Sequence, residues 1–417
     1  MRAAIFTLLA VSAAAAADEQ QLALSLRAQT DFDRVALPAA PPLRDIAACI
    51  QSQAALLPVA PPEEQPVVHF RKGYCTLAHA AIAGEPATYR AAAAEFQLAL
   101  DAWPARAAIV ARKKQPAEPE SSGLRVLAQI ARWKAGDAAP DAAEHELAAA
   151  VAARACPAGV MAGVRCEAAL GLGVQWEGWM ALRRDDLEAA ARDFSVSAAP
   201  GWAAWVAGLQ AFRRGEYGAA AQAYRTAVSD WDAARGQDPP PLLYRLAPPA
   251  DLGQAYTELG GAQLLAGDPS TAIASLSRAV RESPANARAL YLRARARENA
   301  GQSDAALADL SLASRTAFAN AQDLASGEAH LYRGILLYLR RQYAQAEDEF
   351  ASALNFEIPG TMRADASAWR RLAAVASGSC AAGRSDLEQA LPAVSPYFPR
   401  QEARQALAAC ARPPARP

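Results

Sequence analysis

The sequence predicts an all-α fold, an α-solenoid of about eight antiparallel helix pairs in two groups. Three observations predict it. Apolar residues recur at spacings of three and four along most of the 417 residues, which places them on one face of a helix. Turns that contain glycine interrupt this pattern, and the pattern repeats between positions 253 and 287. Hydrophobic residues make up 53% of the chain. Much of that fraction is alanine, which favours helices that pack closely.

The clearest helix pair is predicted between Gly253 and Asn286. Gly267 can end its first helix because glycine accepts a positive φ, Asp268 can cap the second helix, and Pro269 suits the first helical position. The predicted apolar face of the first helix carries Tyr256, Leu259, Gly260 and Gln263, and that of the second carries Ala272, Leu276, Ala279 and Val280. Pro284 then stops the second helix.

This stretch resembles the tetratricopeptide repeat family, whose pattern is W-x2-L-G-x2-Y followed by A-x3-F-x2-A and P. Tyr256 stands in the Trp position and Leu276 in the Phe position. Other stretches fill the Gly and Phe positions with Gly178 and Phe194, Gly208 and Tyr224, and Gly334 and Phe350. The resemblance implies a superhelix in which the first helix of each pair lines a concave groove. It names an architecture and leaves the partner open.

Prolines and changes in composition divide the chain into six expected segments. These are a signal peptide (1–17), a Pro-rich leader with one helix at 43–57 (18–68), divergent N-terminal helix pairs (69–235), a Pro-rich linker (236–252), a C-terminal array (253–379) and a C-terminal cap (380–417). In the first of the divergent pairs, the second helix is expected to close at Pro104, and a polar linker is expected from Ala108 to Gly123.

The N-terminus has the composition of a secretory signal peptide. Arg2 is its basic region, residues 3–11 are apolar, and Ala15-Ala16-Ala17 is a cleavage site. An Ala-rich N-terminal helix is the alternative, but the composition becomes polar at Asp18. We therefore expect an exported chain, periplasmic or secreted. No later stretch is long and apolar enough to predict a membrane span in the mature chain.

Six cysteines are consistent with export. Fifteen pairings are possible, but closeness in the chain favours Cys49 with Cys75, Cys156 with Cys166, and Cys380 with Cys410. Six buried thiols in a cytosolic protein are the alternative. A zinc site is less consistent with the spacing, because the chain has no C-x2-C pair and no His couple beside one.

Charge and motifs argue against several function classes. The formal net charge of −1 gives no basic footprint for nucleic acid. No phosphate-binding, dinucleotide-binding or nucleophile-elbow motif is present, and the four histidines lie in separate units. Glu144-His145-Glu146 is adjacent in sequence, so its side chains leave a helix in different directions. The sequence therefore predicts no enzyme, no cofactor and no metal.

The resemblance implies a partner-binding groove at fixed positions of each first helix. Carried over position by position, it assigns to this groove Trp179, Trp202, Trp205, Phe212, Arg288, Tyr291, Arg295, Tyr338 and Arg370. Two alternatives remain: the tryptophans are core residues, or the leader or the Pro-rich linker fills the groove.

A non-catalytic exported scaffold that binds a protein or peptide partner is the leading interpretation, with an extended or helical apolar segment as its ligand. An exported enzyme with an unrecognised site and a self-assembling structural repeat protein are the alternatives. The sequence leaves the oligomeric state open.

Overall fold

A computed structural model describes residues 2–410, apart from 39, 114–120, 138–139, 157–162, 198, 200, 238–241, 317–323, 381–386 and 397. Pro200, which follows the predicted repeat of Gly178 and Phe194 and suits its end, lies outside the described residues. Side chains are also not described at 2–18, 140–143, 163–165, 243–244, 316 and 324–326, so the residues of the expected signal peptide are described as backbone only.

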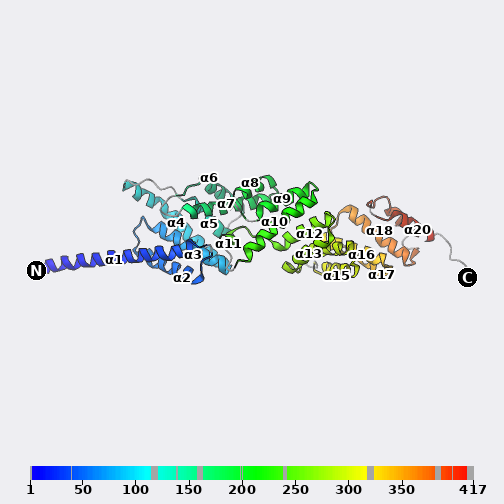
Figure 1. Cartoon of the computed structure of the whole chain (residues 1–417), viewed down its shortest axis with the longest axis horizontal. Helices are drawn as coiled ribbons and strands as arrows, with labels where there is room; N and C mark the ends of the chain where they lie inside the picture. Colours follow the sequence, from blue (N-terminus) through cyan, green and yellow to red (C-terminus); the bar gives the residue numbers. More distant parts are fainter. Residues whose placement is uncertain are drawn as a thin grey trace. The chain divides into compact units, whose positions relative to one another are not determined.

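The described residues form α-helices, one short 3-10 helix and connecting turns, and no strand occurs among them. Consecutive helices pack in pairs (Figure 1), which confirms the predicted fold class. The chain forms two compact units, unit 1 (Met1–Val206 with Ser229–Pro249) and unit 2 (Ala207–Val228 with Ala250–Pro417).

The helices of unit 1 are α1 (Arg2–Ala36), α2 (Leu43–Leu56), η1 (Leu57–Val59), α3 (Gln65–Ala83), α4 (Pro86–Arg112), α5 (Ser122–Lys134), α6 (Pro140–Ala153), α7 (Gly163–Arg183), α8 (Leu187–Val196) and α11 (Leu242–Leu246). Unit 2 contains α12 (Leu252–Leu265), α13 (Pro269–Glu282), α14 (Ala287–Asn299), α15 (Ser303–Thr316), α16 (Leu324–Leu339), α17 (Tyr343–Ala353), α18 (Gly360–Ala376) and α20 (Arg400–Cys410). Two further helices, α9 (Trp202–Arg213) and α10 (Tyr217–Arg235), contribute to both units.

Helix starts follow local side-chain chemistry. The Asp268 carboxylate accepts from the Thr271 backbone N–H at the start of α13, as the sequence predicts. Asp186, Asp251 and Asn286 cap α8, α12 and α14 in the same way. Each cap satisfies one of the N–H groups that have no partner inside the helix.

The spacing of small and large residues that recurs in the repeats of this chain has a packing cause. A Cβ placed at Gly178 would lie 3.1 Å from the Phe194 ring, and one placed at Gly208 would meet Tyr224 at 2.5 Å. Gly334 stands in the same relation to Phe350. Glycine in the first helix therefore lets the ring of the second helix lie flat against its backbone.

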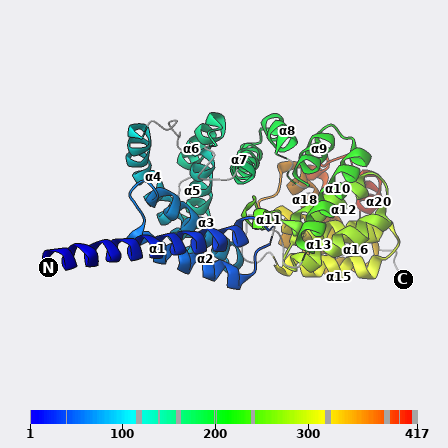
Figure 2. The same cartoon turned by 60° about the vertical axis from the view of Figure 1, so that its left-hand side comes forward.

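The leader differs from the expectation of one helix. It contains the end of α1 as well as α2 and η1, and α3 already begins at Gln65. Figure 2 shows α1 lying along α2 while its beginning extends beyond it. Phe32 on α1 is fully buried and meets Phe70 and Tyr74 of α3 edge-on, so apolar burial holds this part of the leader helical.

Pro104 does not end its helix. It lies inside α4, which continues to Arg112, so the expected linker begins later than Ala108. Trp103 and Val110 are both buried, and their burial offsets the hydrogen bond that proline cannot make.

The expected boundary at residue 235 also differs from the division of the chain, which passes from unit 1 to unit 2 within α9 and returns within α10.

The cysteines are joined as the nearest-neighbour pairs. The Cα–Cα distances are 6.2 Å for Cys49–Cys75, 5.7 Å for Cys156–Cys166 and 5.6 Å for Cys380–Cys410. The first bridge links α2 to α3 and is fully buried, and the third links the segment after α18 to the end of α20. Across the part of the chain that the structure describes, no helix is both long and apolar enough for a membrane span.

Candidate functional site

The first helices of three successive pairs, α3, α5 and α7, share one face of unit 1, which we call the first-helix face. Helix α11, which lies within the expected Pro-rich linker, contacts α3 and α7 of this face (Figure 1). Leu242 and Leu246 of α11 are 5% and 0% exposed and belong to the core of unit 1. The described helix of the expected linker is therefore a packed element.

Two donors of the first-helix face hold the end of α11. The Trp176 Nε1–H donates to the Leu246 carbonyl at 3.1 Å, and the Lys134 ammonium donates to the Arg245 carbonyl at 3.0 Å. The last carbonyls of a helix have no partner inside it, and a cation beside them is favourable. In return, the Arg245 guanidinium donates to the Ala81 carbonyl at 3.4 Å. The face thus recognises the backbone at the C-terminal end of a short helix.

Aromatic rings surround the lysine. The Lys134 ammonium lies 5.9 Å from the Tyr89 ring centroid and 5.8 Å from that of Trp176. Burial lowers the pKa of Lys134 to about 8, because it penalises the charged form. A cation beside aromatic rings and the last carbonyls of a helix gives the largely apolar first-helix face one polar group that binds a helix end.

Trp179, one of the predicted groove residues, lies beside Trp133 and Trp176 on the first-helix face. It is half-buried and meets Trp133 and Trp176 edge-on at 5.8 and 5.4 Å between centroids. The Arg183 guanidinium lies 5.0 Å from its ring.

Trp202 and Trp205 are core residues, which corrects their assignment to the groove. They are only 7% and 8% exposed. Trp202 stacks on Phe194 at 5.1 Å, and both tryptophans contact Trp231, at 5.0 and 5.7 Å. The one-position uncertainty of a repeat alignment is enough to move a side chain from groove to core, because adjacent residues on a helix face different directions.

In unit 2, three predicted groove residues, Arg288, Tyr291 and Arg295, lie on α14, and two of them contact Tyr332 of α16. The Arg295 guanidinium lies 5.9 Å from the ring centroids of both Tyr291 and Tyr332, and the two rings meet edge-on. Arg295 is exposed, while the tyrosines are half-buried. Arg288, one turn before Tyr291 on α14, pairs with Glu258 of α12 at 3.6 Å and keeps 59% of its side chain exposed.

The other predicted groove residues of unit 2 lie apart from this cluster. Tyr338 is 6% exposed and its hydroxyl donates to Glu402 of α20 at 3.0 Å, so the C-terminal cap covers it. Arg370 is half-buried on α18 and pairs with Glu347 at 3.7 Å. Phe212 is half-buried and meets Tyr217 edge-on. Tyr338 is thus a packing residue and not part of an open groove.

A recurrent ion pair inside the helix pairs was missed by sequence reasoning. The carboxylate just before the Phe position of the second helix accepts from a cation just before the Gly position of the first: Lys72–Glu95 at 2.7 Å, Arg293–Asp309 at 2.7 Å and Arg333–Glu349 at 2.8 Å. His69 and His330, one turn earlier, add a second contact to Glu95 and Glu349. The available signal was the place of each charge directly before the Gly or Phe position, and the separation of sixteen residues in two of the three pairs. Two of the four histidines are therefore structural.

Known proteins offer fold-level comparisons. No model of a protein family and no curated protein matches this chain. A tetratricopeptide repeat protein from Parabacteroides merdae is similar over 70% of this chain and all of that chain, at 13% identity and a TM-score of 0.37. The C-terminal part of a repeat protein from Cytophaga hutchinsonii covers 67% of this chain and 94% of its own, at 12% identity and 0.38. Yeast Tom70 covers 88% and 86%, at 10% identity and 0.38.

The packing within each pair decides the repeat type. Gly178–Phe194, Gly208–Tyr224 and Gly334–Phe350 repeat one spacing and one contact. These are tetratricopeptide-type helix pairs. The first helices of such pairs carry both the first-helix face of unit 1 and the cluster of Arg288, Tyr291, Arg295 and Tyr332 in unit 2, which we call the Arg/Tyr cluster.

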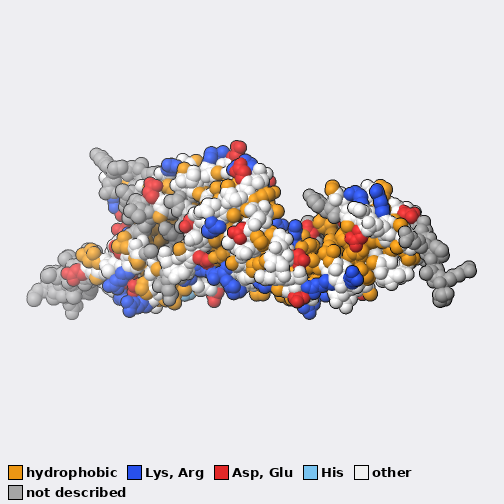
Figure 3. Space-filling view, turned by 45° about the vertical axis from the view of Figure 1, so that its right-hand side comes forward, with side chains coloured by type: hydrophobic (Ala, Val, Ile, Leu, Met, Phe, Trp, Pro, Cys, Tyr) orange, Lys and Arg blue, Asp and Glu red, His pale blue; other side chains and the backbone are white. Residues whose placement is uncertain are grey.

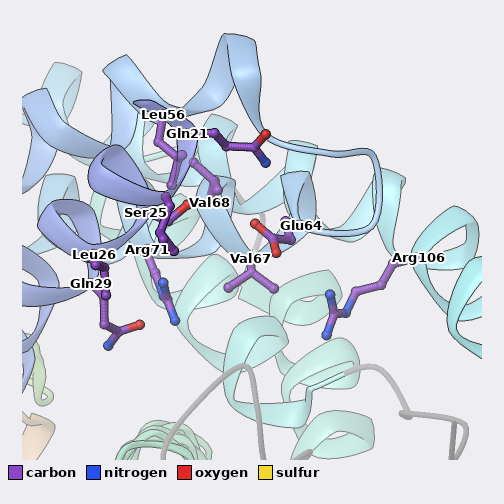
Figure 4. Close-up of a pocket in the computed structure, with 11 residues that line it drawn as sticks. Gln21, Ser25, Leu26, Gln29, Leu56, Glu64, Val67, Val68, Arg71 and Arg106 are labelled. Atoms are coloured by element: carbon purple, nitrogen blue, oxygen red, sulfur yellow. The ribbon is translucent and has the colours of Figure 1, made fainter. Parts of the chain in front are cut away.

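A separate cavity of about 620 Å³ lies between α1, α3 and α4 of unit 1 (Figure 4). Arg71 and Arg106 line it together with Glu64, and aliphatic side chains such as Leu26 and Val67 form the rest. The Arg71 guanidinium also lies over Phe32, and that of Arg106 donates to the Glu63 carbonyl. The lining has both polar and apolar groups, and the chain's own residues already engage both guanidinium groups.

On the face shown in Figure 3, acidic and basic side chains are interspersed, and hydrophobic side chains are exposed between them on unit 2. Among the described residues, no three His, Cys, Asp or Glu side chains are grouped so as to hold a metal ion.

Proposed function

We propose that this chain is an exported, non-catalytic scaffold that binds a segment of a protein partner through the first helices of unit 2. The observation that carries the proposal is the position of Arg295 beside both Tyr291 and Tyr332, with Arg288 on the same helix. Tyrosine and arginine concentrate binding energy at protein interfaces. The tyrosine ring buries a large area at low entropic cost, and the guanidinium offers several hydrogen-bond donors in a fixed plane.

The chemistry of this cluster favours a segment with an acidic and an apolar side chain. A carboxylate can take a bidentate contact from an exposed guanidinium, and an apolar group can lie on the tyrosine rings. Burial raises the pKa of both Tyr291 and Tyr332, so their hydroxyls stay protonated and can donate to the partner.

Three features support export and a binding role. The first seventeen residues have the pattern of a signal peptide. Six cysteines form three bridges, which persist in oxidising compartments. Two histidines that could serve in catalysis, His69 and His330, are engaged by glutamates inside their own helix pairs.

Site-specific photo-crosslinking tests the proposal. A photoreactive phenylalanine analogue replaces Tyr291 in one variant and Leu312, an exposed residue of α15, in a matched control. We expect one partner protein to be crosslinked from position 291 in the native envelope or secreted fraction, and not from position 312. Adding Arg295→Ala should abolish the product, while Arg315→Ala, on α15, should not. Equal products from both positions, or a product insensitive to Arg295→Ala, contradict the proposal.

A further inference from the structure

The way in which α11 is held resembles the binding of a ligand more than the packing of a repeat helix. Its five residues are too few for an isolated helix to be stable in water. Its described contacts include two buried leucines four residues apart and two backbone carbonyls, those of Arg245 and Leu246. The Arg245 guanidinium adds a hydrogen bond to the Ala81 carbonyl. The two leucines and the two carbonyls are features that any short helix with the same two side chains can present.

Proline surrounds this segment and separates it from the repeats. The sequence PPP precedes Leu242, and Pro248 and Pro249 follow the helix. Proline restricts the residue before it to extended conformations, so neither α10 nor α12 can run on into α11. The segment is therefore a discrete element on a tether, joined to the rest of the chain at Arg235 and Leu252.

We propose that residues 242–246 are an internal ligand, and that the first-helix face of unit 1 is a receptor for a short partner helix with two aliphatic side chains four residues apart. Such a helix takes the place of α11, with its last carbonyls on Lys134 and Trp176. This site is distinct from the Arg/Tyr cluster of unit 2, and it goes beyond the function proposed for that cluster.

The tether sets how strongly α11 competes. A segment joined to its receptor by a short stretch of the same chain has an effective concentration on the order of millimolar. A partner helix that makes only the same contacts therefore binds the intact chain weakly, and weakening α11 exposes the full affinity of the face. This difference is measurable with a peptide.

The probe is a fluorescein-labelled synthetic peptide of residues 237–250, followed by fluorescence anisotropy with the full-length protein. The open variant carries Leu242→Gln and Leu246→Gln, and a milder one carries Leu246→Ala alone. The matched control carries Leu98→Gln and Val196→Gln, two exposed apolar residues of unit 1. Circular dichroism and thermal melting establish whether each variant is folded.

We expect the open variant to bind the peptide at least tenfold more tightly than the wild type or the control. The same peptide with both leucines changed to Gln should not bind. Adding Trp176→Phe, which removes the donor to the Leu246 carbonyl, should weaken binding to the open variant. Equal binding by the wild type and a folded open variant, or no binding by that variant, overturns the proposal. Loss of folding in both the Leu242→Gln/Leu246→Gln and Leu246→Ala variants overturns it too, because unit 1 then cannot stay folded when α11 leaves its face.

Discussion

Glu177 on α7 and Asp193 on α8 occupy the two positions at which three other helix pairs place a cation opposite a carboxylate. Their spacing equals that of Arg293 and Asp309, sixteen residues apart. A Cβ placed at Gly178, next to Glu177, would lie 3.2 Å from the Asp193 Cβ. Burial, then Asp193, then Glu144 of α6 raise the pKa of Glu177 to about 7. The α7–α8 pair thus has two acids at the positions where three other helix pairs of this chain have an ion pair.

This arrangement predicts a stability of unit 1 that depends on pH. The folded pKa of Glu177 lies above its ordinary value of 4.5, so its protonated form favours folding. That contribution is complete below pH 4.5 and is lost as the pH rises to about 7. We expect Glu177→Gln to raise the melting temperature at pH 8 and to leave it unchanged at pH 4.5.

Glu167→Gln, on the exposed side of the same helix, is the control for this experiment and should have no effect at either pH. The neighbouring charges stay in place in both variants, including Arg184, which pairs with Glu144. A gain from Glu177→Gln that is equal at both pH values would show that the carboxyl does not titrate in this range.

The Arg293–Asp309 pair predicts a large loss of stability when its acid is removed. Asp309 has 5% of its side chain exposed and also contacts Arg297 at 2.6 Å. Asp309→Asn leaves two guanidinium groups without their counter-charge in a buried site, at a cost of about 3–5 kcal/mol. Asp304, the partner of Arg340, has 94% of its side chain exposed. Asp304→Asn should therefore cost only about 0–1 kcal/mol. Urea unfolding of both variants measures the difference, and similar losses would contradict it.

Two adjacent glycines of α12 predict opposite effects. A Cβ at Gly260 would overlap Leu276 of α13, whereas one at Gly261 would lie in ordinary contact with Leu292 at 3.5 Å. Gly260→Ala should therefore destabilise unit 2 by about 1–3 kcal/mol through overpacking. Gly261→Ala should stabilise it by about 0.5–1 kcal/mol, because alanine favours the helix. Thermal melting of the two variants decides this, and a loss of stability in Gly261→Ala would argue against the packing described for this pair.

The buried bridge between α2 and α3 predicts dependence on oxidation. Cys49 and Cys75 are 0% exposed and 26 residues apart. Replacing both with Ala should lower the free energy of unfolding by about 3 kcal/mol, chiefly by freeing the unfolded chain. Peptide mapping without reduction should recover the three nearest-neighbour pairs from the purified protein, and free thiols in that sample would contradict them.

Local signals in the sequence were sufficient for the helix pairs. The cap at Asp268 and the contact of each Gly with a ring or Leu depend on residues a few positions apart or at one fixed spacing. The cysteine couples were likewise recognisable because each closes a short stretch of chain. By contrast, Pro104 lies within a helix, because the burial of Trp103 and Val110 outweighs a local rule.

The candidate sites could be predicted only in part. The sequence placed Arg288, Tyr291 and Arg295 on one helix, and the structure brings Tyr332 of α16 to them. It assigned Trp202 to a groove, although the stacking of Phe194 on it makes it core. Which side of a first helix is covered depends on elements distant in the chain, and periodicity contains no information on those.

The sequence by itself determined an all-α repeat chain and its turns, because these follow from interactions within one helix pair, and it favoured the nearest-neighbour cysteine pairs. Only the tertiary structure decided that α11 fills the face of α3, α5 and α7, and that Glu177 meets Asp193. The physical reason is that burial and charge at these positions depend on which helices meet. For α11, the donors Lys134 and Trp176 lie 111 and 70 residues away in the chain from the carbonyls that they hold.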